Sequence, residues 1–353
     1  MQLKTYVQIS DLHFRVAPQA MLHHTYISLL QLCPWLDGWL GHDPRALAAV
    51  EKLFDRLEAG GEQPEVIVTG DLTQVGAPDQ FDEAKTFLGG SSAGSQGLQP
   101  SLNASDWRER AVPGNHDHWP GYLPVAPCSP SPALHNLFGT GMFVGPKIPL
   151  SRDVRLRLIG VNSDHDVPAN TVRLFTLGRF EQALQGLPML QHDPDEVRVL
   201  LIHHSPSYQG RTWLPSKDTR WLEIEPASLT ALETFVRTYS ISVVLTGHIH
   251  TYLFVNVYPA GSSLGSNVLE ARCGSTTQIN NPRARLRRRL GLPTKIPGEP
   301  NTAIVHRIFE TDSGIEWVAQ AYWRNAQNEF VPLDSVNSGG CSFSTGLQVW
   351  RRP

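Results

Sequence analysis

The chain has 353 residues, of which 41% are hydrophobic and 18% are charged, so it can bury a sizeable core in one large domain or two smaller ones. Its formal net charge of −3 excludes a global attraction to nucleic acid or to acidic membranes. The four cysteines are scattered and form no Cys-x-x-Cys pair, which argues against a disulfide framework and against a zinc finger. No segment has the composition of a membrane span or of a signal peptide, so we expect a cytoplasmic protein.

Short strand-like runs in the first two-thirds of the chain each end in a polar motif. Residues 3–9 alternate in polarity, and further apolar runs occupy residues 65–69, 107–112, 197–202 and 241–246. The motifs that follow these five runs are, in chain order, Ser10-Asp11-Leu12-His13, Gly70-Asp71, Gly114-Asn115-His116-Asp117, His203-His204 and Gly247-His248-Ile249-His250. Ligands bind at the carboxyl ends of the strands in open α/β sheets, so these motifs are the candidate site.

Helical patterns separate these strands. Asp43 is predicted to cap a helix that begins at Pro44 and ends at Gly60, and further helices are predicted at residues 79–88, 178–187 and 226–239. Later strands are predicted at residues 252–258, 268–273, 303–310 and 315–323, the last two as a hairpin. This order predicts an α/β fold with one domain over residues 1–325 and a C-terminal tail at residues 326–353.

Three segments fall outside this alternation. Residues 16–42 form an apolar insertion, either a loop or short helix packed on the domain, or a hydrophobic lid or oligomer contact. Residues 118–150 are rich in Pro and Gly and predict an irregular loop on the substrate side. An insertion at residues 276–300 holds an arginine run that is either a solvated or partner-facing surface or a site that captures a polyanion. The run comprises Arg283, Arg285, Arg287, Arg288 and Arg289, and it has no interleaved aromatic residue, which disfavours nucleic-acid binding.

The polar motifs supply the ligands that two metal ions need to hydrolyse a phosphate ester. Two ions about 3.5–4 Å apart activate water and neutralise the phosphoryl group, and a carboxylate must bridge them. Asp71 is the candidate bridge. The remaining ligands are expected to divide between the two sites as Asp11, His13 and His250 on one side, and Asn115, His203 and His248 on the other.

Two of the motifs carry their candidate ligands two residues apart. Asp11 and His13 are two residues apart, as are His248 and His250, and in an extended chain such side chains point to the same side. The set contains no thiolate, which disfavours a structural zinc site. It suits two divalent or trivalent ions chosen from Mn, Fe, Zn and Co.

His116 adjoins the candidate ligand Asn115, so we interpret it as a general acid or as a charged donor to the phosphate. Asp117 is expected to orient this imidazole. His203 is expected to be the metal ligand because the preceding strand ends at residue 202, and His204 is the alternative.

Three further residues are candidates for substrate binding. Trp119 follows the third motif by two residues, and His204 adjoins a candidate ligand. Asn162 follows a strand predicted at residues 154–161 and is either a substrate contact or part of a turn. Asp164 is expected to be solvated.

These five motifs resemble, in the same order, those of the calcineurin-like metallophosphoesterase superfamily. The resemblance implies a four-layer α/β/β/α sandwich with the metals at the strand ends, the ligand roles given above and a catalytic role for His116. Purple acid phosphatases carry a tyrosine where Gln74 stands, and lipid A pathway hydrolases usually carry an arginine where His116 stands. Protein Ser/Thr phosphatases have a different run after the bridging aspartate. The motifs are most similar to those of the bacterial cyclic-nucleotide phosphodiesterase branch.

The sequence therefore predicts a two-metal phosphodiesterase that acts on a small anionic diester, with a cyclic nucleotide as the leading candidate. A phosphomonoesterase acting on a nucleotide, sugar or lipid phosphate is the first alternative. A nucleic-acid processing protein that uses the arginine run and an inactive scaffold are the others. Residues 16–42 are the candidate oligomer contact.

Overall fold

The structure is a computed structural model that describes residues 1–14, 42–90, 100–207, 223–250, 252–255, 268–277, 301–312, 314–333 and 347–351. The apolar insertion at residues 16–42, except for His42, lies outside the described residues. The arginine run at residues 283–289 also lies outside them. None of the helices in the described residues is long and apolar enough to cross a membrane.

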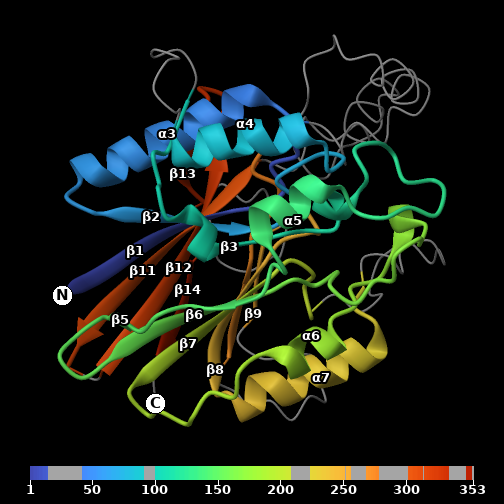
Figure 1. Cartoon of the computed structure of the whole chain (residues 1–353). Coiled ribbons are helices and arrows are strands. Elements are labelled where there is room, and N and C mark those ends of the chain that lie inside the picture. Colours follow the sequence, from blue (N-terminus) through green and yellow to red (C-terminus); the bar gives the residue numbers. More distant parts are fainter. Residues whose placement is uncertain are drawn as a thin grey trace, which may run out of the picture.

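Two mixed β-sheets, each with seven strands in the described part of the chain, stack between helices (Figure 1). The first sheet comprises β1 (Gln2–Ile9), β2 (Pro64–Thr69), β3 (Ala111–Val112), β11 (Thr302–Thr311), β12 (Gly314–Arg324), β13 (Phe330–Pro332) and β14 (Leu347–Arg351). The second comprises β4 (Phe143–Val144), β5 (Ile148–Pro149), β6 (Arg155–Val161), β7 (Glu196–Ile202), β8 (Ile241–Thr246), β9 (Leu253–Val255) and β10 (Leu269–Arg272). The helices are α3 (Pro44–Ala59), α4 (Pro78–Gly89), α5 (Pro132–Phe138), α6 (Glu181–Gly186) and α7 (Pro226–Thr238).

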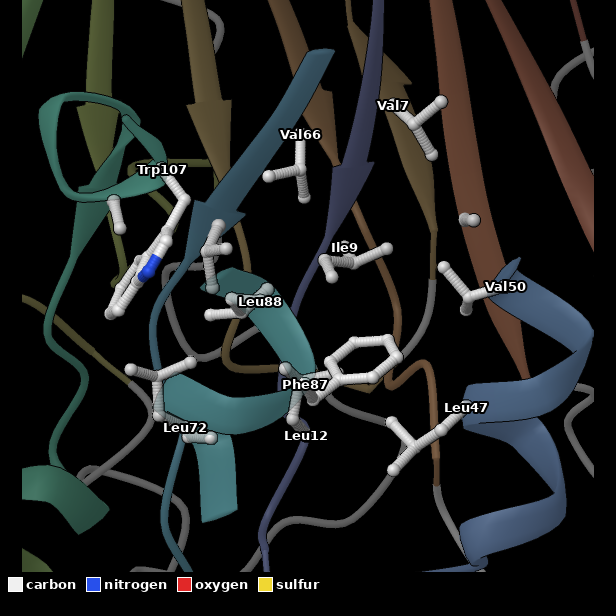
Figure 2. Packing of buried hydrophobic residues seen from close by; sticks show 14 of the residues in the cluster. Val7, Ile9, Leu12, Leu47, Val50, Val66, Leu72, Phe87, Leu88 and Trp107 are labelled. Carbon is white, nitrogen blue, oxygen red and sulfur yellow. The ribbon is translucent and has the colours of Figure 1, made fainter. Parts of the chain in front are cut away.

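The layers follow from the alternation of side chains along each strand. In β1, Val7 and Ile9 face the helices, whereas Tyr6 faces the other sheet. Figure 2 shows Val7, Ile9 and Val66 packed on the side of α3 and α4, where Leu47 and Val50 of α3 project toward them. The buried side chains of the second sheet likewise point to two sides. Some pack in the core between the two sheets, and the others pack in a core under α6 and α7. The expected four-layer α/β/β/α sandwich is confirmed.

Most predicted elements are present with shifted ends, and three segments differ. Residues 107–110 form a 3₁₀ turn rather than strand, and the buried Arg110 at its end donates from Nε to the carbonyl of Val66 (3.0 Å). The segment 118–150 is not wholly irregular, since it contains α5, β4 and β5. Strands β13 and β14 both pair with β12, so part of the segment that we interpreted as a tail belongs to the first sheet.

A buried polar chain joins the two sheets beneath the strand ends. Gln8 of β1 donates from Nε2 to the carbonyl of Thr246 in β8 (2.9 Å) and to the hydroxyl of Thr69 in β2 (3.1 Å). His306 contacts Gln8 Oε1 through Nε2 (3.0 Å) and accepts from Trp317 Nε1 (3.0 Å). Strands β1–β3 run parallel to one another, as do β6, β7, β8 and β10, and the link at Gln8 brings the ends of both sets together.

Candidate metal centre

The turns after β1, β2 and β8 hold candidate ligands in left-handed backbone conformations. The φ angles are 52° at Asp11, 47° at His13, 51° at Asp71, 73° at His248 and 56° at His250, which makes five of the nine non-glycine residues with positive φ in the described chain. This conformation costs about 1–2 kcal/mol for a residue with a Cβ, so the surrounding structure must impose it. Asp11 and His13 thus reach one cluster through left-handed turns, whereas His248 and His250 reach different clusters, so the extended-chain reasoning was wrong.

Hydrogen bonds between the turns impose these conformations. Asp11 N donates to the carbonyl of Gly70 (3.0 Å), and His13 N donates to the carbonyl of Asp71 (3.0 Å). His248 N donates to Asp11 Oδ2 (3.1 Å), which ties the second sheet to the first. Three strand ends therefore form one rigid unit.

The glycines of the motifs make room for the polar side chains. A Cβ on Gly70 would lie 2.3 Å from His203 Nδ1, and one on Gly114 would lie 2.3 Å from Asp71 Oδ1. A Cβ on Gly247 would lie 2.0 Å from the hydroxyl of Ser10. Glycine is required at these positions because any side chain would displace a group that forms the site.

The first cluster contains Asp11, His13 and His250, all buried. His250 Nε2 lies 3.2 Å from Asp11 Oδ1 and 3.3 Å from His13 Nε2. The second cluster is centred on His203, whose Nε2 lies 3.1 Å from Asn115 Oδ1.

Asp71 and His248 complete the second cluster. His203 Nε2 lies 3.3 Å from Asp71 Oδ2 and 3.2 Å from His248 Nδ1. The same Asp71 oxygen lies 3.9 Å from His13 Nε2 of the first cluster. Asp71 therefore stands between the clusters, where a bridging carboxylate is required.

The spacing of these atoms fits metal ions. Bonds of about 2.1 Å from one ion to two ligand atoms place those atoms about 3.0–3.4 Å apart at octahedral to tetrahedral angles. The contacts of His203 and His250 at 3.1–3.3 Å fall within this range. Without an ion, His13 Nε2 and His250 Nε2 face each other although only one of them can donate a hydrogen. The donor set fits two ions with nitrogen and oxygen ligands.

Burial and neighbouring charges shift the pKa values of the candidate ligands in different directions. Burial lowers the pKa of His203, but the carboxylates of Asp71 and Asp11 outweigh burial and raise this pKa to about 10. Burial raises the pKa of Asp71, but His203 and His116 outweigh it and hold this pKa well below its usual range. Burial, aided by His116, lowers the pKa of His13 to about 3. The centre thus presents two carboxylates, which attract cations, beside a neutral His13 that can coordinate them and a His203 that must first lose a proton.

His116 lies with His13 and Asp71 in a third group of side chains that could hold an ion, and it also has partners of its own. Its Nδ1 lies 2.9 Å from the carbonyl of Gln74, so Nδ1 carries the hydrogen and Nε2 is the nitrogen available for proton transfer. The ring of Trp119 stacks on His116 with centroids 4.0 Å apart and planes inclined by 26°. Burial lowers the pKa of His116, although Asp71 acts in the opposite direction, so the imidazole is neutral at pH 7.

Asp117 does not orient His116, contrary to our expectation. Its carboxylate accepts hydrogen bonds from the amides of Leu72 (3.1 Å), Thr73 (2.8 Å) and Gly114 (3.0 Å). These donors lie in two motif turns, and a carboxylate is the acceptor that satisfies several converging amides. Asp117 therefore holds the turn after β2 against the turn after β3.

The three candidate substrate contacts are all engaged inside the protein. Trp119 is 1% exposed and packs on His116 and Val75. The Asn162 side chain accepts from His118 Nε2 (2.9 Å) and donates to the carbonyl of Thr140 (3.1 Å). His204 is fully buried behind the second cluster. Packing buries Trp119 and His204, and hydrogen bonds hold the Asn162 side chain, so direct substrate contact by these residues stays a prediction.

Sequence reasoning missed a buried polar layer beside the centre. Asp164 is 1% exposed rather than solvated, and burial raises its pKa to about 7. Arg173 is 3% exposed and His118 is 5% exposed. The only available signal was that polar residues follow a predicted strand at Asn162, which also fits an ordinary turn.

The serine that separates the paired histidines from Pro206 has a structural partner. Ser205 donates to Glu270 Oε1 (2.6 Å) and accepts from Arg272 Nη1 (3.3 Å). Glu270 also accepts from the hydroxyl of Thr246 (3.2 Å). Strand β10 thus anchors the loop that follows His203 and His204.

A known family model covers the part of the chain that contains this centre. The profile of the calcineurin-like phosphoesterase family matches residues 4–252, which contain all five motifs. No curated protein matches the chain.

Several solved structures resemble the chain over most of its length at low identity. They include GAP50, the anchor in the inner membrane complex of Plasmodium, at 11% identity and a TM-score of 0.44, covering 98% of this chain and 96% of that one. Vps29 of Entamoeba histolytica, complexed with Zn²⁺, aligns at 14% identity and a TM-score of 0.32, covering 93% and 98%. Phosphopantetheinyl hydrolase of Mycobacterium tuberculosis aligns at 12% identity and a TM-score of 0.37, covering 88% and 98%.

Proposed function

The chain belongs to the calcineurin-like phosphoesterase family, and we propose that it hydrolyses phosphodiester bonds of a small anionic substrate, such as a cyclic nucleotide, with two metal ions. The observation that carries this proposal is the convergence of nitrogen and oxygen atoms from five strand-end motifs around Asp71. Seven residues would hold the ions: Asp11, His13, Asp71, Asn115, His203, His248 and His250. When bound, such ions activate water as the nucleophile and neutralise the phosphoryl charge.

His116 is proposed to donate a proton to the leaving oxygen. The carbonyl of Gln74 fixes Nδ1–H, so a second proton can be carried only on Nε2. Burial keeps the free imidazole neutral, and an anionic phosphate beside it would favour the protonated form. A protonated Nε2 could then donate to the leaving oxygen, while the stacked Trp119 prevents the ring from rotating away.

The choice between a diester and a monoester is tested with paired substrates. The protein is stripped of metal and then supplied with Mn²⁺, Zn²⁺, Fe²⁺ or Co²⁺, and rates are measured on bis(p-nitrophenyl) phosphate and p-nitrophenyl phosphate. Faster metal-restored cleavage of the diester supports the proposal, and cyclic nucleotides follow as substrates. Faster cleavage of the monoester would replace the proposal with a phosphomonoesterase.

Two controls complete this experiment. The variant Asp71→Asn shows whether turnover comes from this centre, because it keeps the side-chain volume and removes the shared negative charge. The absence of turnover with every metal, together with the absence of bound metal, would refute the enzyme and leave a scaffold.

A further inference from the structure

His204 occupies a defined place behind the second cluster. Its side chain is fully buried, and its ring lies 4.2 Å from the ring of His248 between centroids, with the planes inclined by 39°. The ring also meets His203 edge to face, at 5.5 Å and 87°. His204 thus touches two candidate ligands and lies outside the groups of side chains that could hold an ion in the described chain.

Two neighbours fix the ring of His204. Its Nδ1 lies 2.7 Å from the hydroxyl of Ser163, at the end of β6. Its other side faces Gly178, where a Cβ would lie 3.0 Å from Cγ, 3.2 Å from Nδ1 and 3.3 Å from Cδ2 of the imidazole. The ring therefore fills the space between Gly178 and His248.

The backbone at Gly178 cannot easily retreat. Gly178 N donates to the carbonyl of Glu223 (3.1 Å), and the carbonyl of Gly178 accepts from Glu225 N (2.9 Å). Both the N–H and the carbonyl of Gly178 are thus hydrogen-bonded to the segment that leads into α7. A group added to Gly178 would consequently push the His204 ring toward His248 rather than move the backbone.

We propose that His204 is a positioning residue whose clamped ring sets the orientation of the His248 imidazole at the metal site. The inference rests on the proposed function, since it concerns a ligand of the second ion. The hydrogen bond from His248 N to Asp11 Oδ2 holds the backbone of His248 at a φ of 73°, and the contact with the ring of His204 restricts the imidazole itself. Residues that orient metal ligands usually affect affinity strongly, because small rotations misdirect the lone pair.

The variant Gly178→Ala tests this without altering any polar group. The glycine does not have a positive φ, so alanine adds a methyl group without backbone strain. Ordinary contact begins at 3.4 Å and the nearest ring atom lies at 3.0 Å, so the ring must shift by about 0.4 Å. The matched control is Gly186→Ala in α6, where a Cβ would meet no atom within 4 Å.

The readout is Co²⁺ titration of the metal-free protein, followed by visible absorption and by bound metal per chain. We expect the wild type and Gly186→Ala to bind two ions with the same spectrum. Gly178→Ala should bind one of the two ions about 10–100-fold more weakly and change its spectrum. Ser163→Ala, which removes the hydroxyl 2.7 Å from Nδ1 of His204 without added bulk and leaves Asp164 Oδ2 at 3.7 Å from that nitrogen, should act in the same direction.

Thermal unfolding of the metal-free proteins separates positioning from general damage. A purely structural role would lower the unfolding temperature of Gly178→Ala and Ser163→Ala but leave the Co²⁺ spectrum and affinities unchanged, and that result would overturn the inference alone. A wild-type protein that binds no Co²⁺ would overturn the proposed function together with the inference.

Discussion

Replacing Gly114 by alanine should damage the centre without changing any side chain proposed to bind metal. The glycine lies in the turn after β3, and it does not have a positive φ, so the backbone tolerates alanine. The added Cβ, however, would lie 2.3 Å from Asp71 Oδ1 and 2.4 Å from Asp71 N. Asp71 cannot withdraw, because its carbonyl accepts from His13 N (3.0 Å) and its Oδ1 accepts from His116 N (2.8 Å).

The expected losses of stability and turnover follow from how closely the added Cβ would approach Asp71. Contact is ordinary from 3.4 Å, so the shortfall at Asp71 Oδ1 is 3.4 − 2.3 = 1.1 Å. Overpacking of this kind destabilises a protein by about 1–3 kcal/mol. A displacement of about 1 Å at reacting groups lowers the rate by about 100-fold. We therefore expect a large loss of turnover with a modest loss of stability.

The assay compares Gly114→Ala with Gly186→Ala, whose added Cβ meets no atom within 4 Å. Metal per chain, urea unfolding and hydrolysis of bis(p-nitrophenyl) phosphate are measured on both proteins. The control should behave as the wild type. If Gly114→Ala bound two metals and retained wild-type turnover, the steric role of this glycine and the placement of Asp71 between the ions would both be refuted.

Further outcomes follow from the same geometry. Asp71→Asn should bind fewer than two metals and lose at least about 100-fold in rate, and metal analysis showing two tightly bound ions would contradict the bridging role. His116→Ala should retain both metals but lose about 10²–10⁴-fold in rate, most severely for poor leaving groups, and a normal rate on such a substrate would exclude the general acid. Burial lowers the pKa of His306 to about 3. Below about pH 6.5 this imidazole is therefore protonated in the unfolded chain but stays neutral in the native protein. The free energy of unfolding is therefore unaffected by His306 above that pH, and it falls by about 1.4 kcal/mol per pH unit between there and pH 3. Urea unfolding at pH 7 and pH 5 should show a smaller loss for His306→Gln than for the wild type, and equal losses would refute the assignment.

The sequence alone determined the layers and the motifs that hold the candidate ligands. Alternating apolar residues such as Val7 and Ile9 mark the face of β1 that packs on helices, because successive side chains on a strand point to opposite sides. The polar motifs follow strands that run parallel, and parallel strands end at one edge of a sheet. That local information places Asp11 and His13 together at the end of β1, whereas His250 reaches them from the second sheet.

Only the tertiary structure decided what each neighbouring polar residue does. His203 and His204 are adjacent in sequence, yet one faces Asn115 and the other packs between Gly178 and His248. The sequence suggested Asp117 as a partner for His116, but backbone amides from two turns donate hydrogen bonds to its carboxylate. Such assignments depend on atoms that are distant in sequence and meet only when both sheets are assembled, so no local pattern of residues encodes them.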